Sequence, residues 1–276
     1  MRVVMLGTGT PNADPDRSGP AVAVIVNGET LIIDAGAGVV RRAALAARTD
    51  SIPELTPPHL SKLFLTHLHS DHTVALPDLI FSPWVLDRTA PIEIYGPPGT
   101  TRMVDLIEQA YSEDVDIRLH GGEPSNKTGW RAIARDEQPG VVYRDSNVTV
   151  TAFAVAHGKW PHAYGYIFQS RDRKIVLSGD TRPTDAVVNA CDGCDLLLHE
   201  VYSATQFTKR SPEWQRYHAA YHTSSTELAA IATRARPKLL VLYHQLYWGD
   251  DDAGLVREVK AGYNGAVVAG RDLGVY

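Results

Sequence analysis

The chain has 276 residues, a hydrophobic content of 44% and a charged content of 21%. This composition is typical of globular proteins and excludes extended disorder and fibrous repeats. No apolar run is long enough to predict a membrane span, and the apolar start of the chain is too short for a signal peptide. The formal net charge of −5 disfavours a broad nucleic-acid surface, although a local basic patch is compatible with it. Two cysteines cannot cross-link a domain of this size, so we expect a cytoplasmic protein.

The first half of the chain alternates short strands with helices. Strands are expected over residues 2–6, 21–26, 30–34, 62–66 and 91–95, with Asn27-Gly28 as a hairpin turn. Helices are expected over residues 36–48 and 100–111. Residues 114–145 are polar and weakly periodic, which indicates loops and marginal strands.

The second half continues the same alternation. Strands are expected over residues 148–156, 164–169, 174–178, 195–199, 238–243 and 266–269. Helices are expected over residues 185–190, 225–236 and 253–261, and Glu227 is placed for a capping box at the start of the second. No repeat or linker interrupts the pattern. It predicts a single domain over residues 1–276, built on two mixed sheets covered by helices.

Three histidines fall within the six residues His67-Leu-His-Ser-Asp-His72. His67 and His69 are two residues apart at the end of a strand, so their rings point the same way. Asp71 and His72 follow on a turn that can face them from another side. Imidazole and carboxylate suit zinc or a neighbouring first-row ion. Because one tetrahedral site cannot take four ligands from so short a segment, the cluster predicts two metal ions.

The motif His-x-His-x-Asp-His after a strand is the signature of the metallo-β-lactamase superfamily, which this sequence resembles. The resemblance continues in the order of the ribonuclease Z-like branch through Gly7-Thr-Gly9, Asp34, His157, Ser178-Gly-Asp180, His199-Glu200, His222-Thr-Ser and Tyr243-His244. Three further segments resemble the arylsulfatase and phosphodiesterase members of that branch: Pro77-Asp-Leu-Ile-Phe81, Ile94-Tyr-Gly-Pro-Pro98 and His244-Gln245. The resemblance implies an α/β (α+β) fold, a four-layer αββα sandwich of two mixed β-sheets flanked by helices, with the metal site at one edge.

Carried over residue by residue, the resemblance implies two metal sites. One ion would be held by His67, His69 and His157, and the other by Asp71, His72 and His244, with Asp180 bridging the two ions. The local sequence supports the three distant ligands independently, because His157, Asp180 and His244 each follow a predicted strand. Such strand ends converge most simply at one rim of a sheet sandwich. Two Zn²⁺ ions are expected, with Mn²⁺ or Fe²⁺ as substitutes.

Asp71, Glu200 and His222 are the expected catalytic residues. Two dications, two carboxylates and a bridging hydroxide leave a formal positive charge, which favours an anionic substrate attacked by that hydroxide. The resemblance pairs Glu200 with His222, and a carboxylate bonded to one ring nitrogen would raise the pKa of His222 so that it can protonate a leaving group. The open alternative is that His222 caps the helix that begins near Ser225.

This centre predicts a metal-dependent hydrolase. We expect it to cleave small anionic esters, namely phosphodiesters and aryl sulfates, with phosphotriesters as a side reaction. The alternative is an endoribonuclease that processes tRNA 3′ ends with the same centre. That activity calls for a basic arm that grips tRNA, and residues 112–147 mix basic side chains with many acids. A non-catalytic binding protein is disfavoured because every expected ligand position is filled. The resemblance also implies a homodimer, and no membrane partner is expected.

Two weaker signals remain. Cys191 and Cys194 have the spacing of a redox or zinc motif, but without a second pair we interpret them as buried thiols. Aromatic residues gather between Tyr202 and Tyr221 and near the predicted ligands, where they either line an aryl pocket or pack in the core: Phe207, Trp214, Tyr217, Tyr221, Trp160 and Trp248.

Overall fold

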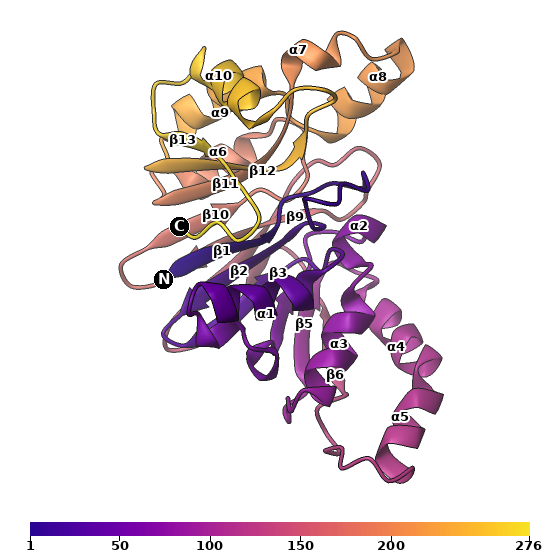
Figure 1. Cartoon of the computed structure of the whole chain (residues 1–276). Helices are drawn as coiled ribbons and strands as arrows, with labels where there is room; N and C mark the ends of the chain where they lie inside the picture. Colours follow the sequence, from indigo (N-terminus) through magenta and orange to yellow (C-terminus); the bar gives the residue numbers. More distant parts are fainter. The chain divides into compact units, whose positions relative to one another are not determined.

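The computed structural model describes all residues from 1 to 276 (Figure 1). Their internal contacts divide them into two compact units, each built on one β-sheet. Unit 1 comprises Met1–Gly7, Pro11–Glu137 and Asp272–Tyr276, and unit 2 comprises Thr8–Thr10 and Gln138–Arg271. The expectation of a single domain over residues 1–276 stays a prediction. None of the helices combines the length and the apolar character that crossing a bilayer requires.

The sheet of unit 1 has six strands in chain order: β1 (Arg2–Gly7), β2 (Ala21–Val26), β3 (Glu29–Ile33), β4 (Lys62–Phe64), β5 (Ile92–Gly96) and β6 (Ala132–Asp136). Its first three strands are antiparallel, and β3 to β6 are parallel, so the sheet is mixed. The predicted hairpin is present between β2 and β3. Asn27 and Gly28 have φ angles of 48° and 86°, which a two-residue turn with the favoured twist requires.

Helices cover one face of this sheet: α1 (Val39–Thr49), α2 (Ser70–Thr73), α3 (Leu76–Val85), α4 (Thr100–Ala110) and α5 (Ser112–His120), with the 3₁₀ turns η1 (Pro53–Leu55) and η2 (Pro57–His59). Helix α1 buries Val39, Val40, Ala43 and Ala46, whose spacing places them on one side. They pack in one core cluster with apolar residues of β1 to β5 and of α3. This cluster stabilises the strand end that leads into the histidine motif.

The sheet of unit 2 has seven strands in the order β13-β12-β11-β10-β9-β8-β7. Their bounds are β7 (Gly140–Arg144), β8 (Thr149–Ala154), β9 (Tyr164–Gln169), β10 (Lys174–Leu177), β11 (Leu196–Tyr202), β12 (Leu239–Leu246) and β13 (Val267–Ala269). Strands β7 to β10 are antiparallel and β10 to β13 are parallel, so this sheet is mixed as well.

The helices of unit 2 are α6 (Asp185–Cys191), α7 (Ala204–Phe207), α8 (Pro212–Tyr221), α9 (Ser225–Ala235) and α10 (Asp252–Lys260). Apolar residues of α6, α9 and α10 form one core cluster with β10 to β13. The predicted capping box is present at α9, where Ser224 and Glu227 satisfy each other's backbone N–H groups. Two mixed sheets flanked by helices confirm the predicted fold class.

Five helices lie where the sequence did not predict them: α2, α3, α5, α7 and α8. Helix α3 contains Pro77 and Pro83, residues that normally argue against a helix, but they occupy its first and last turns. Helix α5 overlaps the start of residues 114–145, a stretch predicted as loops and marginal strands. It buries only Val115, so its periodicity is weak, and an Asp114–Arg118 ion pair joins successive turns.

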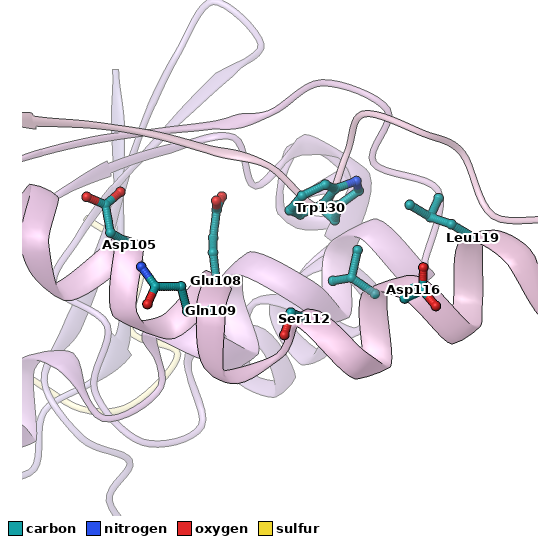
Figure 2. Close-up of a pocket in the computed structure, with 8 residues that line it drawn as sticks. Asp105, Glu108, Gln109, Ser112, Asp116, Leu119 and Trp130 are labelled. Carbon is teal, nitrogen blue, oxygen red and sulfur yellow. The ribbon is translucent and has the colours of Figure 1, made fainter.

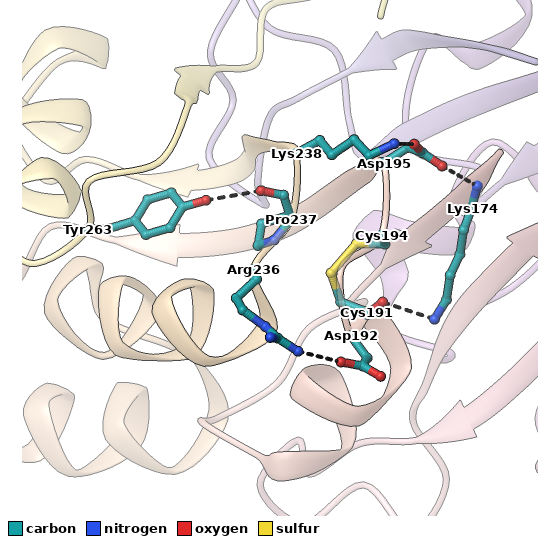
Figure 3. Close-up of a disulfide and its surroundings, with 9 residues drawn as sticks. All are labelled: Lys174, Cys191, Asp192, Cys194, Asp195, Arg236, Pro237, Lys238 and Tyr263. Carbon is teal, nitrogen blue, oxygen red and sulfur yellow. Dashed lines mark hydrogen bonds and ion pairs between the residues drawn. A yellow bond between two sulfur atoms is a disulfide. The ribbon is translucent and has the colours of Figure 1, made fainter.

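The prediction of two buried thiols is wrong, because Cys191 and Cys194 form a disulfide (Figure 3). Both cysteines are buried, as expected. Between them Asp192 and Gly193 have φ angles of 33° and 77°, so the chain turns tightly enough to bring the two Cα atoms to 4.7 Å. The bridge ties the end of α6 to the start of β11, and Lys174 donates a hydrogen bond to the Cys191 carbonyl beside it.

Candidate metal centre

The histidine motif of unit 1 runs from an extended segment into a helical turn. Strand β4 ends just before it, and His69 is the residue at which helix α2 begins. Nε2 of His67 and Nδ1 of His69 are 2.9 Å apart, so the two rings converge as the spacing predicts. Helix α2 carries Asp71 and His72, and the Asp71 carboxylate lies 3.5 Å from Nε2 of His72. All four motif side chains are therefore gathered within one strand end and one helical turn.

Asp34 orients this motif, a role that the sequence did not reveal. The residue follows β3 and has a φ angle of 60°, a conformation that Asp tolerates better than most residues. His72 Nδ1 donates to the buried Asp34 carboxylate at 2.7 Å, which leaves Nε2 of His72 as the ligand atom. The Thr66 hydroxyl also donates to Asp34 and lies 3.0 Å from Nδ1 of His67. One carboxylate thus positions two of the predicted ligands.

In unit 2 the predicted ligands gather around Asp180. This residue follows β10 after Ser178 and Gly179, and the φ angle of 62° at Gly179 makes the turn. The buried Asp180 Oδ2 lies 4.0 Å from Nε2 of His157 and 3.6 Å from Nε2 of His244. The three residues come from β8, β10 and β12 or from the loops that follow them, as the resemblance implies.

His244 does not end its strand, contrary to the prediction. Strand β12 continues to Leu246, and His244 is an extra residue within it: Tyr243 pairs with Glu200, and Gln245 pairs with Val201. The φ angle of 46° at His244 accommodates this bulge. A β-bulge re-aims the side chain of its extra residue, which here directs the imidazole towards Asp180.

His157 is oriented by backbone rather than by a carboxylate. Its Nδ1 donates to the Tyr221 carbonyl at 2.8 Å, which leaves Nε2 as the ligand atom. Gly158 follows with a φ angle of 54°, and a Cβ at this position would lie 2.0 Å from the Tyr221 ring. The glycine therefore permits the contact between the His157 loop and the end of α8.

Glu200 and His222 form the predicted pair. Glu200 Oε2 lies 3.4 Å from Nδ1 of His222, while Glu200 Oε1 accepts from the backbone N–H of Thr223 at 2.8 Å. Burial, and then the negative charge of Asp180, raise the pKa of Glu200 well above its usual value. A cation beside Asp180 would offset the second cause. Helix α9 is capped by Ser224, so His222 has no capping role there.

His199 is buried beside this pair but is not a candidate ligand. Its Nδ1 donates to the Glu200 carbonyl, and burial lowers the pKa of the ring to about 4, so it is neutral at physiological pH. His199 belongs to none of the groups of side chains whose atoms could hold a metal ion, whereas Glu200 does, so Glu200 is the candidate functional residue of this motif.

The donor atoms fit a divalent metal ion. In unit 2 the ligand atoms of His157, Asp180 and His222 lie within 4.8 Å of one another, and so do those of Glu200, His222 and His244. In unit 1 the converging nitrogens of His67 and His69 and the nearby Asp71 offer the same chemistry. Oriented imidazoles with buried carboxylates are the usual environment of zinc and related ions. Four of the seven predicted ligands belong to unit 1 and three to unit 2.

A separate pocket in unit 1 has a different character (Figure 2). It measures about 450 Å³ and lies between α4, α5 and Trp130. Its lining includes the carboxylates of Asp105, Glu108 and Asp116, which repel phosphate groups, and it contains no imidazole. The pocket is therefore unsuited to a phosphate-bearing substrate.

The chain is similar to known proteins along most of its length. Residues 29–245 match the Beta-lactamase superfamily domain. A protein named Ribonuclease Z from Mycobacterium bovis (strain BCG / Pasteur 1173P2) is 32% identical over 248 residues, which cover 88% of this chain and 85% of that protein. Another of the same name, from Mycobacterium marinum, is 30% identical, and the alignment covers 88% of this chain and 86% of that protein.

Solved structures show the same fold. The metallo-β-lactamase fold protein YhfI from Bacillus subtilis has a TM-score of 0.76 and 18% identity, covering 100% of this chain and 98% of that one. The short form of human tRNase Z has a TM-score of 0.73 and 24% identity, with the same coverage.

These comparisons overturn the predicted hydrolysis of small anionic esters, because the curated relatives are named Ribonuclease Z. The prediction was wrong because it relied on the net charge of −5 and on the lack of a basic arm. Net charge describes the whole surface and does not exclude local binding of an anionic polymer. The superfamily, the branch and the metal-dependent hydrolase are confirmed, while the phosphodiesterase and arylsulfatase subtype gains no support. The chain belongs to the β-lactamase superfamily, within its ribonuclease Z branch.

Proposed function

We propose that this protein is an endoribonuclease that removes 3′ trailers from tRNA precursors. The observation that carries the proposal is the 32% identity to a protein named Ribonuclease Z over 88% of the chain. The matched region includes the histidine motif and the residues around Asp180. The likeness in fold to human tRNase Z is consistent with the same activity.

The proposed metal ligands are those expected from the sequence: His67, His69, Asp71, His72, His157, Asp180 and His244. When bound, two divalent ions supply an activated water and positive charge beside the scissile phosphate. Asp34 and the Tyr221 carbonyl hold the Nδ1 protons of His72 and His157, and each ring therefore presents its Nε2. The ligand set is preorganised by these hydrogen bonds, which reduces the cost of ordering it around a cation.

His222 is the proposed general acid, with Glu200 as its positioning residue. Two backbone N–H groups hold Glu200 Oε1, so its Oε2 stays fixed near His222 Nδ1. With Nδ1 facing that carboxylate, Nε2 of His222 is the atom that can donate a proton to the departing ribose oxygen. This geometry supports Nε2 of His222 as the nitrogen that transfers the proton.

Three finer points belong to the same proposal. The ions are Zn²⁺ in the native protein, the enzyme acts in the cytoplasm, and the chain forms a homodimer. Metal analysis of freshly purified protein checks the first point, and light scattering at several concentrations checks the third.

The test is cleavage of a tRNA precursor that carries an unpaired 3′ trailer. We expect the metal-replete protein to release the trailer as one fragment, and a chelator or His157→Ala to abolish release. His120→Ala is the matched control, because that histidine lies on α5 with an exposed side chain. A precursor that stays intact with metal-replete wild-type protein would overturn the proposal.

A further inference from the structure

Helix α8 carries two rows of rings spaced four residues apart, so each row follows one side of the helix. In the first row Trp214 stacks on His218 with ring centroids 5.4 Å apart, and His218 lies 5.6 Å from His222. In the second row Tyr217 stacks on Tyr221 at 4.4 Å. Each row therefore runs from the outer part of α8 towards its C-terminal end.

Both rows end at the candidate site of unit 2. The first ends on His222, the proposed general acid. The second ends where the Tyr221 ring meets the His157 ring edge to face, with centroids 5.0 Å apart. The aromatic side chains of α8 are thus in continuous contact with two side chains that the proposed function uses.

The outer ends of the two rows are exposed. Trp214 is 49% exposed and Tyr217 is 38% exposed, and the two rings pack edge to face with centroids 5.6 Å apart. Packing accounts for the inner aromatic residues, since Phe207 and Trp248 both contact the buried Tyr202 ring. It does not account for two adjacent rings left open to solvent, which mark a surface suited to a flat ligand.

The segment that carries these rings has a net positive charge, unlike the whole chain. Between Thr205 and Tyr221 there are three cationic residues, Lys209, Arg210 and Arg216, and a single acid, Glu213. The Arg210 guanidinium lies 5.6 Å from the Trp214 ring and 5.3 Å from the Trp248 ring. Its Nε has no hydrogen-bond partner within the protein. A guanidinium beside indole rings can still donate its terminal N–H groups to a phosphate.

We propose that Trp214 and Tyr217 form a platform on which unpaired nucleotides of the RNA stack, while Lys209, Arg210 and Arg216 contact its phosphates. The proposal rests on the proposed function and names the part of the substrate that α8 binds, the single-stranded trailer. Every base has a π face, so a stacking platform binds a strand irrespective of its sequence. The two ring rows connect this platform to His222 and His157.

The test measures binding separately from cleavage. A fluorescent, unstructured RNA of about ten nucleotides is titrated with the full-length metal-bound protein, and anisotropy gives Kd. We expect Trp214→Ala to weaken binding about tenfold, since stacking of one base is worth that much, and Trp214→Phe to retain binding within about threefold. Tyr111→Ala is the matched control, because Tyr111 is 41% exposed on unit 1, and it should bind as the wild type does.

Abasic RNA separates stacking from charge. Removal of the bases keeps every phosphate, so we expect the wild type to lose more than about tenfold in affinity, and Trp214→Ala to lose about tenfold less than the wild type does, because only Tyr217 still stacks in the variant. Equal binding of RNA by the wild type and Trp214→Ala would overturn the platform, even if the precursor is cleaved. RNA binding that depends on Trp214, without cleavage of the precursor, would support the platform and refute the proposed endoribonuclease.

Discussion

The two units carry their shares of the predicted ligands in different ways. In unit 1, four ligands lie in six consecutive residues, and the Asp34 carboxylate orients two of them, His72 directly and His67 through the Thr66 hydroxyl. In unit 2, His157, Asp180 and His244 come from distant segments, and backbone features position them: a carbonyl, a glycine turn and a bulge. The ligands of unit 1 can be recognised in the sequence as a motif, whereas the arrangement of those of unit 2 depends on the structure of the sheet. This difference predicts that the ligands of unit 1 depend on one orienting side chain, Asp34, whereas those of unit 2 depend on the backbone conformation around them.

The largest expected effect comes from removing one carboxylate in each unit. Asp180→Ala should lower precursor cleavage by about a thousandfold or more, because Asp180 lies near three imidazoles and metal charge stabilisation is worth several kcal/mol. Asp71→Ala should cost less, because Asp71 is proposed to hold one ion whereas Asp180 is expected to bridge both. Cleavage rates with excess metal, together with metal content, check this order. Asp185→Ala, an exposed acid on α6, is the control. A larger loss with Asp71→Ala than with Asp180→Ala would contradict this order.

The next largest effect is expected for the pair formed by Glu200 and His222 in unit 2. His222→Ala should lower the cleavage rate by about a hundredfold to ten-thousandfold, since the leaving oxygen then departs without a proton. A precursor with sulfur in place of that oxygen needs no proton, so His222→Ala and the wild type should cleave it at similar rates. The single-turnover rates of both substrates give the measurement. If sulfur fails to rescue the variant, His222 is not the general acid.

Asp34→Ala tests the orienting carboxylate of unit 1. Metal affinity should fall by about tenfold to a hundredfold, the usual cost of losing such a partner of a metal-binding histidine. Competition with a coloured chelator measures the affinity, and excess metal should restore part of the activity. Unchanged affinity would show that the motif orders itself without Asp34.

The smallest effect concerns the backbone of unit 2. Gly158→Ala should lower the free energy of unfolding by about 1–3 kcal/mol, because the new Cβ meets the Tyr221 ring at a positive φ angle. Gly193→Ala is the matched control: its φ angle is also positive, at 77°, but nothing lies within 4 Å of the added Cβ. Urea unfolding of both variants measures the difference. Equal losses would mean that the contact with Tyr221 contributes nothing beyond backbone strain.

Local signals in the sequence predicted much of the fold. The hairpin at Asn27-Gly28, the capping box at Glu227 and the strands before the histidine motif all follow from patterns of a few residues. Helix α3 was missed because the cost of a proline depends on its place in the helix. The Cys191–Cys194 disulfide was missed because it depends on a left-handed turn that composition does not reveal.

The residues of the candidate site also differ in how far the sequence predicted them. The motif residues were identified from their spacing, and the distant ligands needed the family resemblance in addition. The role of Asp34 could not be predicted, because its hydrogen bond to His72 joins two segments that only the folded sheet brings together. A polar residue directly after a buried strand was the signal available. No local sequence pattern predicts the bulge that places His244 as an extra residue within β12.

The bulge at His244 has a consequence for how this chain can change. If the residue were deleted, Tyr243 would still face Glu200 and Gln245 would still face Val201, so β11 and β12 would pair without interruption. Deletion of this one residue would leave the sheet able to form and would remove the His244 imidazole. At this position the pairing of β11 with β12 does not depend on the metal-ligating histidine. A homologue could therefore lose this proposed ligand and keep the sheet.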